Sequence, residues 1–283
     1  MGSRKKRGSS QTTSSSATPE AGIYSISTGE VELKRDPYGN NAWEIYVNGV
    51  PSSHINTDPS DLAFEYMRWM TACIQDFLAI NPPPYSLRVT HLGGGACSLA
   101  RWFVATYPGS KNTVIEVDAT LATLVRDWFN LPKAPRLKIR VADAAVAVRD
   151  FREASRDIII RDVFAPDTTP RELCTLEFHQ QCAASLEENG IYVANCGDHR
   201  DLTHARSELA TMAKVYPHLA AVADPAMLKG RRYGNIVLLG SKRPIEPSPS
   251  LERILRTDPI PAGFRDHEWC LQFANSAQPY LSL

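Results

Sequence analysis

Three consecutive glycines, Gly93 to Gly95, lie between an apolar run at 87–92 and a helix-like segment, and a carboxylate follows at Glu116. Glycines allow the backbone to turn tightly beside a ligand, and the next helix directs its unpaired N–H groups at that ligand. A carboxylate about 20 residues further on accepts hydrogen bonds from ribose hydroxyls. Glu116 lies 21 residues after Gly95. This segment therefore predicts one half of a Rossmann-like nucleoside site and a cofactor-dependent enzyme.

Two further acids follow apolar runs. Asp143 comes after the run at 137–141, and Asp162 comes after the run at 157–161. Ligands of open α/β sheets bind at the carboxyl ends of the strands, so we expect both acids to face the nucleoside site. Asp143 also suits the N-cap of a helix, and capping is compatible with ligand binding.

The elements that must position these residues alternate along the chain. Five βα units predict a parallel sheet with right-handed crossovers. The last two apolar runs are joined by only ten residues, so we expect them to pair as antiparallel neighbours. The predicted fold is α/β, a Rossmann-like sheet of the S-adenosylmethionine type with an antiparallel terminal hairpin. Its seven strands are expected at 87–92, 112–117, 137–141, 157–161, 191–195, 219–224 and 235–241.

Composition divides the chain into four parts. Residues 1–20 are rich in Ser, Thr, Lys and Arg, and we expect a disordered tail there. Residues 21–60 alternate polar and apolar positions between turn residues, which predicts a small β unit. The nucleoside-binding catalytic domain is expected over 61–245, with a C-terminal extension at 246–283 packed on the body.

Charge and cysteine content narrow the class of protein. The chain carries 31 basic and 31 acidic residues, so we expect no nucleic-acid partner bound through phosphate neutralisation. No apolar run approaches the length of about 18 residues that a membrane span requires. The six cysteines are scattered without a CxxC pair, which predicts reduced thiols, a cytoplasmic protein and no metal site.

Taken in order, the triple glycine, Glu116, the segment 141–144 and the segment 161–164 carry a resemblance to a known family. Over about residues 45–242 the chain resembles the spermidine synthase (polyamine aminopropyltransferase) family, and its actinobacterial spermidine-synthase-like branch in particular. The resemblance implies transfer of an aminopropyl group from decarboxylated S-adenosylmethionine to a diamine such as putrescine, with methylthioadenosine as the product. It also implies a homodimer.

The resemblance assigns roles to individual residues. Asp162 matches the first acid of the family's D-x-x-D-P motif, which deprotonates the attacking amine. A carboxylate suits this role because an ammonium, with a pKa near 10, has no lone pair until it loses a proton. The implied nucleoside-binding residues are Gly93, Gly94, Gly95, Glu116, Asp143 and Ala144, and the implied substrate-binding residues are Phe164, Tyr233 and Glu65.

The chain departs from the family pattern at two acids. Ala96 stands where the family's GGGDGG carries an acid, and Ala165 stands at the second acid of D-x-x-D-P. Each charge-assisted contact to an amine contributes about 1.5–3 kcal/mol, so we expect nucleoside recognition to be intact and diamine recognition to be weakened. Two alternatives stay open: a methyltransferase that uses ordinary S-adenosylmethionine, and a non-catalytic nucleoside- or polyamine-binding protein of the same fold.

Overall fold

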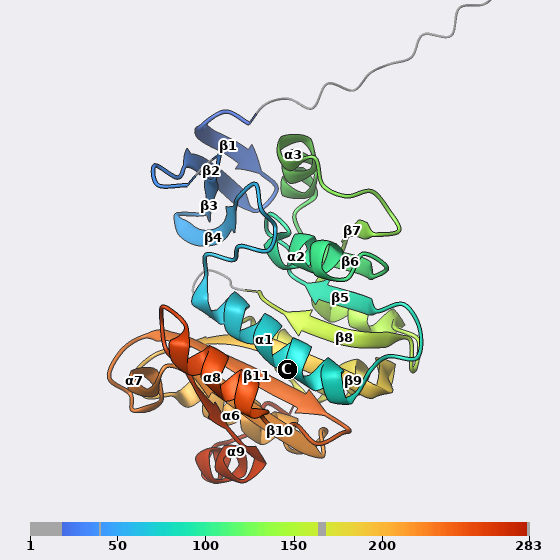
Figure 1. The fold of residues 1–283 in the computed structure, drawn as a ribbon, viewed down its shortest axis with the longest axis vertical. Helices are drawn as coiled ribbons and strands as arrows, with labels where there is room; N and C mark the ends of the chain where they lie inside the picture. The colour runs from blue at the N-terminus through green and yellow to red at the C-terminus, as the bar shows by residue number, and fades with distance from the viewer. Residues whose placement is uncertain (1–18, 40, 164–167, 282–283) are drawn as a thin grey trace, which may run out of the picture.

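The computed structural model describes residues 19–39, 41–163 and 168–281. The described chain forms a four-stranded antiparallel sheet and an eight-stranded, mostly parallel sheet that is covered by helices (Figure 1). The predicted α/β fold with a small N-terminal β unit is therefore confirmed.

The small sheet is a simple antiparallel meander in the order β1-β2-β3-β4. Asn48 and Gly49 have φ angles of 50° and 78°, which is the left-handed pair that a tight hairpin between β3 and β4 requires. The four strands are β1 (Gly22–Ile26), β2 (Gly29–Arg35), β3 (Trp43–Val47) and β4 (Val50–Ile55).

The large sheet has the order β12-β10-β11-β9-β8-β5-β6-β7. The five neighbouring strands β9, β8, β5, β6 and β7 run parallel. β11 pairs antiparallel with β9 and with β10, and its pairing with β10 is the one that the short connection between these two strands predicts. The sheet has one strand more than the predicted seven. Its strands are β5 (Arg88–Leu92), β6 (Lys111–Glu116), β7 (Leu137–Val141), β8 (Arg156–Arg161), β9 (Leu186–Asp198), β10 (His218–Ala223), β11 (Gly234–Ser241) and β12 (Gly263–Arg265).

The extra strand comes from the C-terminal extension. β12 is three residues long and pairs with Ala221–Ala223 of β10. Such a short strand shows no measurable alternation of polar and apolar residues, so its pairing depends on where the neighbouring helices place it.

Helices pack on both faces of the large sheet. The α-helices are α1 (Glu65–Ile80), α2 (Ser98–Thr106), α3 (Ala119–Phe129), α4 (Ala144–Ala147), α5 (Leu176–Ser185), α6 (Thr203–Met212), α7 (Pro225–Leu228), α8 (Pro249–Thr257) and α9 (His267–Ala274), and two short 3-10 helices are η1 (Val148–Asp150) and η2 (Arg171–Leu173). Among the described residues, no helix is long and apolar enough to cross a membrane.

Strand β8 shows how the sheet serves two cores. Ile158 and Ile160 belong to the core that contains residues of α1 and α8, whereas Ile159 belongs to the core that contains residues of α5, α6 and α9. Successive side chains of a strand point to opposite faces, so residues one position apart on β8 lie in different surroundings. This alternation decides the surroundings of the functional residues at the end of the strand.

Among the described residues, the buried apolar side chains of the small sheet belong to a core that it shares with the large sheet. Leu33 and Ile45 pack in one buried cluster with Val114 of β6, Val125 of α3 and Leu137 of β7. The small sheet and this end of the large sheet therefore bury a common apolar surface. Side chains buried in this way contribute to the stability of both parts.

The shared core predicts that the two sheets unfold together. We expect Leu33→Ala, a change at a fully buried side chain, to lower the free energy of unfolding by about 2–5 kcal/mol in a single denaturant transition. The matched control is Ile23→Ala on the neighbouring strand β1, where the side chain is 63% exposed, and it should change stability by about 0.5 kcal/mol or less. Two separate transitions in the parent protein would contradict a shared core.

Candidate active site

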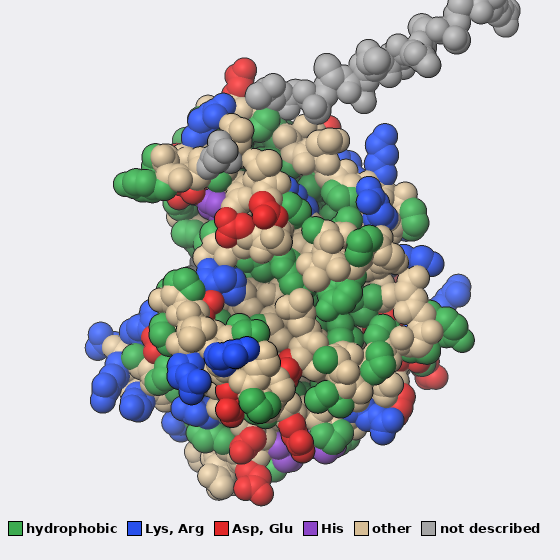
Figure 2. All heavy atoms as spheres, in the orientation of Figure 1, with side chains coloured by type: hydrophobic (Ala, Val, Ile, Leu, Met, Phe, Trp, Pro, Cys, Tyr) green, Lys and Arg blue, Asp and Glu red, His purple; other side chains and the backbone are tan. Residues whose placement is uncertain are grey.

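A cavity of about 810 Å³ lies at the carboxyl ends of β5, β6 and β8. Residues of β4 and α1 also line it, so that the small sheet contributes one wall. Figure 2 shows that the molecular surface is hollowed between the small sheet and the body of the protein. The predicted nucleoside site and this cavity occupy the same edge of the large sheet.

The glycine loop after β5 packs too closely against its neighbours to carry side chains. A Cβ atom on Gly93 would lie 2.3 Å from the main-chain oxygen of Asp162, and one on Gly94 would lie 2.3 Å from Cγ1 of Val114. Gly93 also has a φ of +82°, which residues with side chains rarely adopt. The loop therefore fixes the distance between β5 and the chain that leaves β8.

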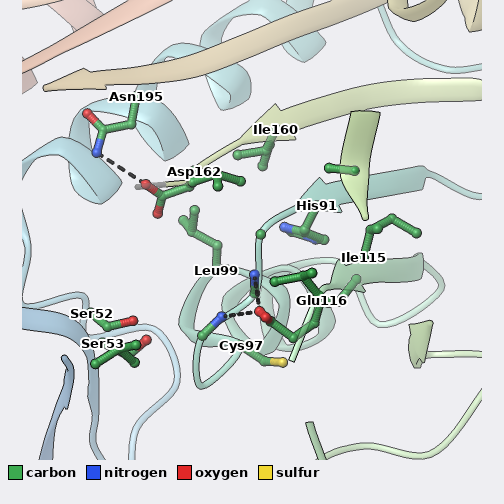
Figure 3. A pocket seen from close by; sticks show the side chains of 18 of the residues that line it. Ser52, Ser53, His91, Cys97, Leu99, Ile115, Glu116, Ile160, Asp162 and Asn195 are labelled. Carbon is green, nitrogen blue, oxygen red and sulfur yellow. Dashed lines mark hydrogen bonds between the residues drawn. The ribbon is translucent and has the colours of Figure 1, made fainter. Parts of the chain in front are cut away.

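Glu116 ends β6 directly beside this loop. Its Oε2 atom accepts hydrogen bonds from the Gly94 and Gly95 N–H groups at 3.1 and 3.2 Å (Figure 3). Its Oε1 atom accepts one from the Asp118 N–H group at 3.0 Å. Burial raises the pKa of this carboxyl group, and the three N–H groups oppose that rise. The carboxylate is thus held in place at the cavity wall, where it can also accept ligand hydroxyls.

Two N-cap aspartates complete this side of the cavity. Asp118 caps α3 through Leu121, and its Oδ2 atom accepts hydrogen bonds from the backbone N–H and the hydroxyl of Thr28 at 2.6 and 2.8 Å. This contact ties the turn between β1 and β2 to the end of β6. Asp143 caps α4 through its Oδ1 atom and the Val146 N–H group, and the side chain remains exposed at the cavity.

Asp162 lies at the opposite side of the cavity from Ser52 and Ser53 (Figure 3). Its Oδ2 atom accepts a hydrogen bond from the Tyr66 hydroxyl at 3.0 Å, and its Oδ1 atom accepts one from Nδ2 of Asn195 at 3.2 Å. Burial raises the pKa of Asp162, and these two hydrogen bonds oppose that rise. The buried Oδ1 atom of Asn195 has no hydrogen-bond partner among the described residues, so a second acceptor lies beside the carboxylate.

The cavity wall is acidic. Among the described residues that line it, none is a lysine or an arginine. His91 lines the cavity as a neutral ring, because burial lowers its pKa to about 4. The carboxylates in the wall are Glu116, Asp118, Asp143, Asp162 and Glu172. Such a wall favours a cationic ligand and opposes an anionic one.

Most of the residues that the sequence selects lie together in this cavity. Glu65 does not line it, and its Oε1 atom accepts a hydrogen bond from Nδ2 of Asn235, which does. Phe164 and Ala165 lie outside the described residues. The selected residues that line the cavity are Gly93, Gly94, Gly95, Glu116, Asp143, Ala144, Asp162 and Tyr233.

The structure adds residues that spacing along the chain does not select. Tyr66 and Asn195 contact Asp162 from elements 96 and 33 positions away in the sequence. Ser53 of β4 accepts a hydrogen bond from the Ala96 N–H group at 3.0 Å, which joins the small sheet to the glycine loop. Asn195 follows the apolar run of β9, and such a position near the end of a parallel strand is a sequence signal for the ligand-binding edge. The contacts of Tyr66 and Ser53 leave no such signal in the sequence.

The position of Ala96 shows what its departure from the family pattern means. Its side chain is fully buried in the core shared by the two sheets, and the residue does not line the cavity. A side chain at this position therefore points into the core and does not reach the cavity, so an acid here would not face the ligand.

Among the described residues no group of three His, Cys, Asp or Glu side chains could hold a metal ion.

The chain is similar to known proteins over its central part. A model of the spermine/spermidine synthase domain matches residues 82–237. The polyamine aminopropyltransferase of Neisseria meningitidis is 30% identical over 152 residues, which are 52% of this chain and 56% of that protein. The eEF1A lysine and N-terminal methyltransferase of Xenopus laevis is 31% identical over 148 residues, which are 48% of this chain and 20% of that protein. The chain thus spans only about half the length of the first of these relatives.

A solved structure is similar over nearly the whole chain. The crystal structure of a probable spermidine synthase from Corynebacterium glutamicum superimposes with a TM-score of 0.90 and is 48% identical. The superposition covers 94% of this chain and 98% of the other. The small sheet, the large sheet and the C-terminal extension therefore fall within the part of the fold that the two proteins share.

The placement of Glu116 predicts its effect on nucleoside binding. We expect Glu116→Ala to weaken the binding of methylthioadenosine about ten- to hundredfold, because it would remove the carboxylate that we expect to accept the ribose hydroxyls. Isothermal titration calorimetry measures the affinity, and Asp127→Ala, an exposed acid on α3, is the matched control. Equal affinities of the Glu116→Ala variant and the parent would show that the nucleoside binds elsewhere.

The same measurement at several pH values tests the state of the carboxyl group. The pKa of Glu116 is raised, so the carboxylate is present above this raised value and is lost as the pH falls through it. Methylthioadenosine binding should therefore begin to weaken at a higher pH than an ordinary glutamate would predict. The Glu116→Ala variant should lack this part of the pH dependence.

Proposed function

This chain belongs to the spermine/spermidine synthase family, and we propose that it transfers an aminopropyl group from decarboxylated S-adenosylmethionine to an amine. One observation carries the proposal: the Asp162 carboxylate lies in a cavity whose described wall holds carboxylates and no lysine or arginine. Both proposed substrates are cations, a sulfonium and an ammonium. We further propose that the acceptor is a diamine and that the product is a polyamine.

The donor would bind along β5, β6 and α4. Glu116 would accept the ribose hydroxyls, and Asp143 with Ala144 would hold the adenine at the start of α4. The glycine loop admits the nucleoside close to the backbone because its residues have no side chains. The acidic wall would then lie near the sulfonium charge, which stabilises this cation in a low-dielectric cavity.

Asp162 would act on the attacking amine. The carboxylate and the free acceptor atom of Asn195 offer two partners for an ammonium. Transfer of one ammonium proton to Asp162 leaves a neutral nitrogen with a lone pair. This nitrogen attacks the methylene carbon bound to sulfur, the C–S bond breaks with its electron pair going to sulfur, and methylthioadenosine leaves as a neutral thioether. Holding both substrates in one cavity provides much of the rate.

The part of the cavity near Asp162, where the acceptor amine would bind, favours an amine that needs few acidic contacts. The Ala96 side chain lies away from the cavity, and Glu65 bonds to Asn235 instead of lining it. A dication such as putrescine would therefore find fewer acidic partners than the family pattern provides. We infer weak binding of putrescine in the parent protein, with Asp162 as the main anionic contact.

A methyltransferase is the second candidate. The Xenopus laevis relative is named for methyl transfer, and this chain shares 31% identity with it over 148 residues. The burial of Ala96 supports this alternative, because no acid at that position selects the amine tail of the decarboxylated donor over the amino-acid tail of ordinary S-adenosylmethionine. Mass spectrometry of products formed with putrescine and each donor separates the two reactions.

The proposed role of Asp162 predicts a loss of turnover without a loss of nucleoside binding. Asp162→Asn keeps the size of the side chain and removes the proton acceptor, so kcat for aminopropyl transfer should fall about 100-fold or more. Calorimetry should show methylthioadenosine affinity within about twofold of the parent, because Glu116 and Asp143 are unchanged.

Asp150→Asn is the control, since that exposed acid at the end of η1 lies outside the cavity wall. Unchanged turnover of the Asp162→Asn variant would show that another group accepts the proton. A parent protein that binds methylthioadenosine and forms no product with either donor would indicate a nucleoside-binding protein without transferase activity.

A further inference from the structure

Arg161 immediately precedes Asp162 and is fully buried on β8. Because side chains alternate along a strand, Arg161 shares the face of Ile159, toward α5 and α6, while Asp162 reaches the Tyr66 hydroxyl of α1. Two adjacent residues therefore place a cation and a carboxylate at the same strand end, on opposite sides of the sheet.

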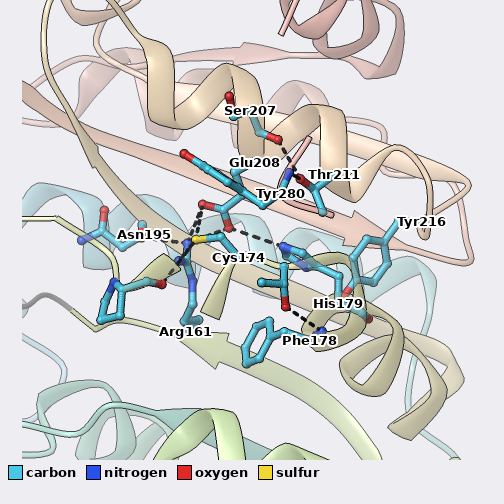
Figure 4. A network of polar contacts seen from close by, with 12 residues as sticks. Arg161, Cys174, Phe178, His179, Asn195, Ser207, Glu208, Thr211, Tyr216 and Tyr280 are labelled. Atoms are coloured by element: carbon cyan, nitrogen blue, oxygen red, sulfur yellow. Dashed lines mark hydrogen bonds and ion pairs between the residues drawn. The ribbon is translucent and has the colours of Figure 1, made fainter. Parts of the chain in front are cut away.

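The Arg161 guanidinium is bound from three elements, as Figure 4 shows. Its Nη2 atom lies 2.8 Å from Oε1 of Glu208 on α6 and donates a hydrogen bond to the main-chain oxygen of Asn195 at 3.2 Å. Its Nη1 atom donates to Sγ of Cys174 at 3.2 Å. Asn195 is the residue whose side chain donates to Asp162. A continuous set of contacts thus runs from Glu208 through Arg161 and Asn195 to Asp162.

We propose that Arg161, held by Glu208, is a positioning residue for Asp162: it fixes Asn195 against the carboxylate and places a buried positive charge behind the same strand end. This inference rests on the proposed function for its catalytic consequence. The contacts that carry it do not depend on the identity of the acceptor. The Arg161–Glu208 pair lies behind the sheet and reaches the cavity through Asn195.

Stability alone gives little reason for this ion pair. Burying two charges costs solvation free energy, and replacing such a pair by apolar side chains of similar size is often neutral or stabilising. The Arg161 and Glu208 side chains are 0% and 1% exposed, so both ions carry the full cost of burial. A pair retained under these conditions at the residue next to the proposed base is consistent with a role in holding that base.

The charge of Arg161 acts on Asp162 directly. Burial raises the pKa of Asp162, and the Arg161 charge opposes that rise together with the hydrogen bonds from Asn195 and Tyr66. Burial alone would favour the neutral form of Arg161, but the negative charge of Glu208 keeps its pKa above the ordinary value. The guanidinium therefore remains a fixed cation throughout the working pH range.

The other titratable groups around Arg161 hold their charge state near neutral pH. Burial lowers the pKa of His179 to about 3, so this ring is neutral. Burial raises the pKa of Tyr66, which faces Asp162 from α1. Burial also raises the pKa of Glu208, and the Arg161 charge opposes that rise. The other groups that face the pair have a pKa raised by burial as well; they are Cys174, Cys182, Tyr192, Cys196, Tyr216 and Tyr280.

The test uses two changes with opposite expected signs. Arg161→Met combined with Glu208→Leu removes the pair without leaving a lone buried charge, and the pKa of Asp162 should rise because the opposing charge of Arg161 is lost. Glu208→Gln leaves the Arg161 charge uncompensated, so the pKa of Asp162 should fall. Titration of the Asp162 carboxyl ¹³C signal by NMR, assigned with Asp162→Asn, measures this pKa without any need for catalysis.

Catalysis provides the second readout. The acid limb of the kcat/KM profile should move with the Asp162 pKa, and kcat of the double variant should fall about tenfold or more. Arg161→Lys keeps the charge and loses the forked contacts, so it should leave the acid limb near its parental pH while lowering kcat. Arg88→Met with Asp157→Asn and Glu187→Gln is the control, since it removes the ion pairs that join β5 to β8 and β9 at the other edge of the sheet.

The outcomes separate this inference from the proposed function. If the parent forms no aminopropyl product, the proposed function fails, and the NMR titration still tests the contact between Arg161 and Asp162. If the double variant does not fold, Glu208→Gln and Arg161→Lys supply the same comparison. An Asp162 pKa and a kcat that stay at parental values in these variants, with methylthioadenosine affinity also unchanged, would overturn the inference.

Discussion

The close approach of the glycine loop to its neighbours is the constraint on which the rest of the site depends. Gly93 lies against the main chain of Asp162, Gly94 against Val114, and Gly95 against the hydroxyl of Ser53. These contacts bring β5, β6, the end of β8 and β4 to one place. The N–H groups of the same loop then hold Glu116, so backbone packing and side-chain placement are set together.

Charge in this protein is distributed unevenly although its sum is zero. Carboxylates from the ends of several strands line one cavity, and their described partners are N–H groups, hydroxyls and amides instead of cations. Neutral donors hold a carboxylate in place without cancelling its charge at the cavity. The cavity can therefore attract a cation even though the whole chain has no net charge.

At the end of β8, two adjacent residues of opposite charge, Arg161 and Asp162, point to opposite sides of the sheet. Asp162 opens to the cavity, while Arg161 is buried with Glu208 behind the sheet. Asn195 on the neighbouring strand touches both, through its side chain on one side and its main-chain oxygen on the other. Parallel pairing of β8 with β9 makes this contact possible, because Arg161 pairs with Ala194 and the next residues, Asp162 and Asn195, lie side by side.

The sequence by itself determined the α/β class, the antiparallel pair at the end of the chain and the acids at strand ends. Glycine spacing and hydrophobic alternation are local signals, and they are sufficient to select Gly93–Gly95, Glu116 and Asp162. The same signals did not show β12, whose three residues are too few for a periodic pattern. The resemblance to the family also selected Glu65, which the structure places outside the cavity wall.

Tertiary structure decided the partners of these residues. Ser53 meets Ala96 across 43 positions of sequence, and Tyr66 meets Asp162 across 96. Such contacts depend on how helices and sheets pack, and the pattern of apolar residues fixes which face of an element is buried without fixing which side chain it meets. The burial of Ala96 and the opposite orientations of Arg161 and Asp162 follow from that packing, so only the folded chain shows them.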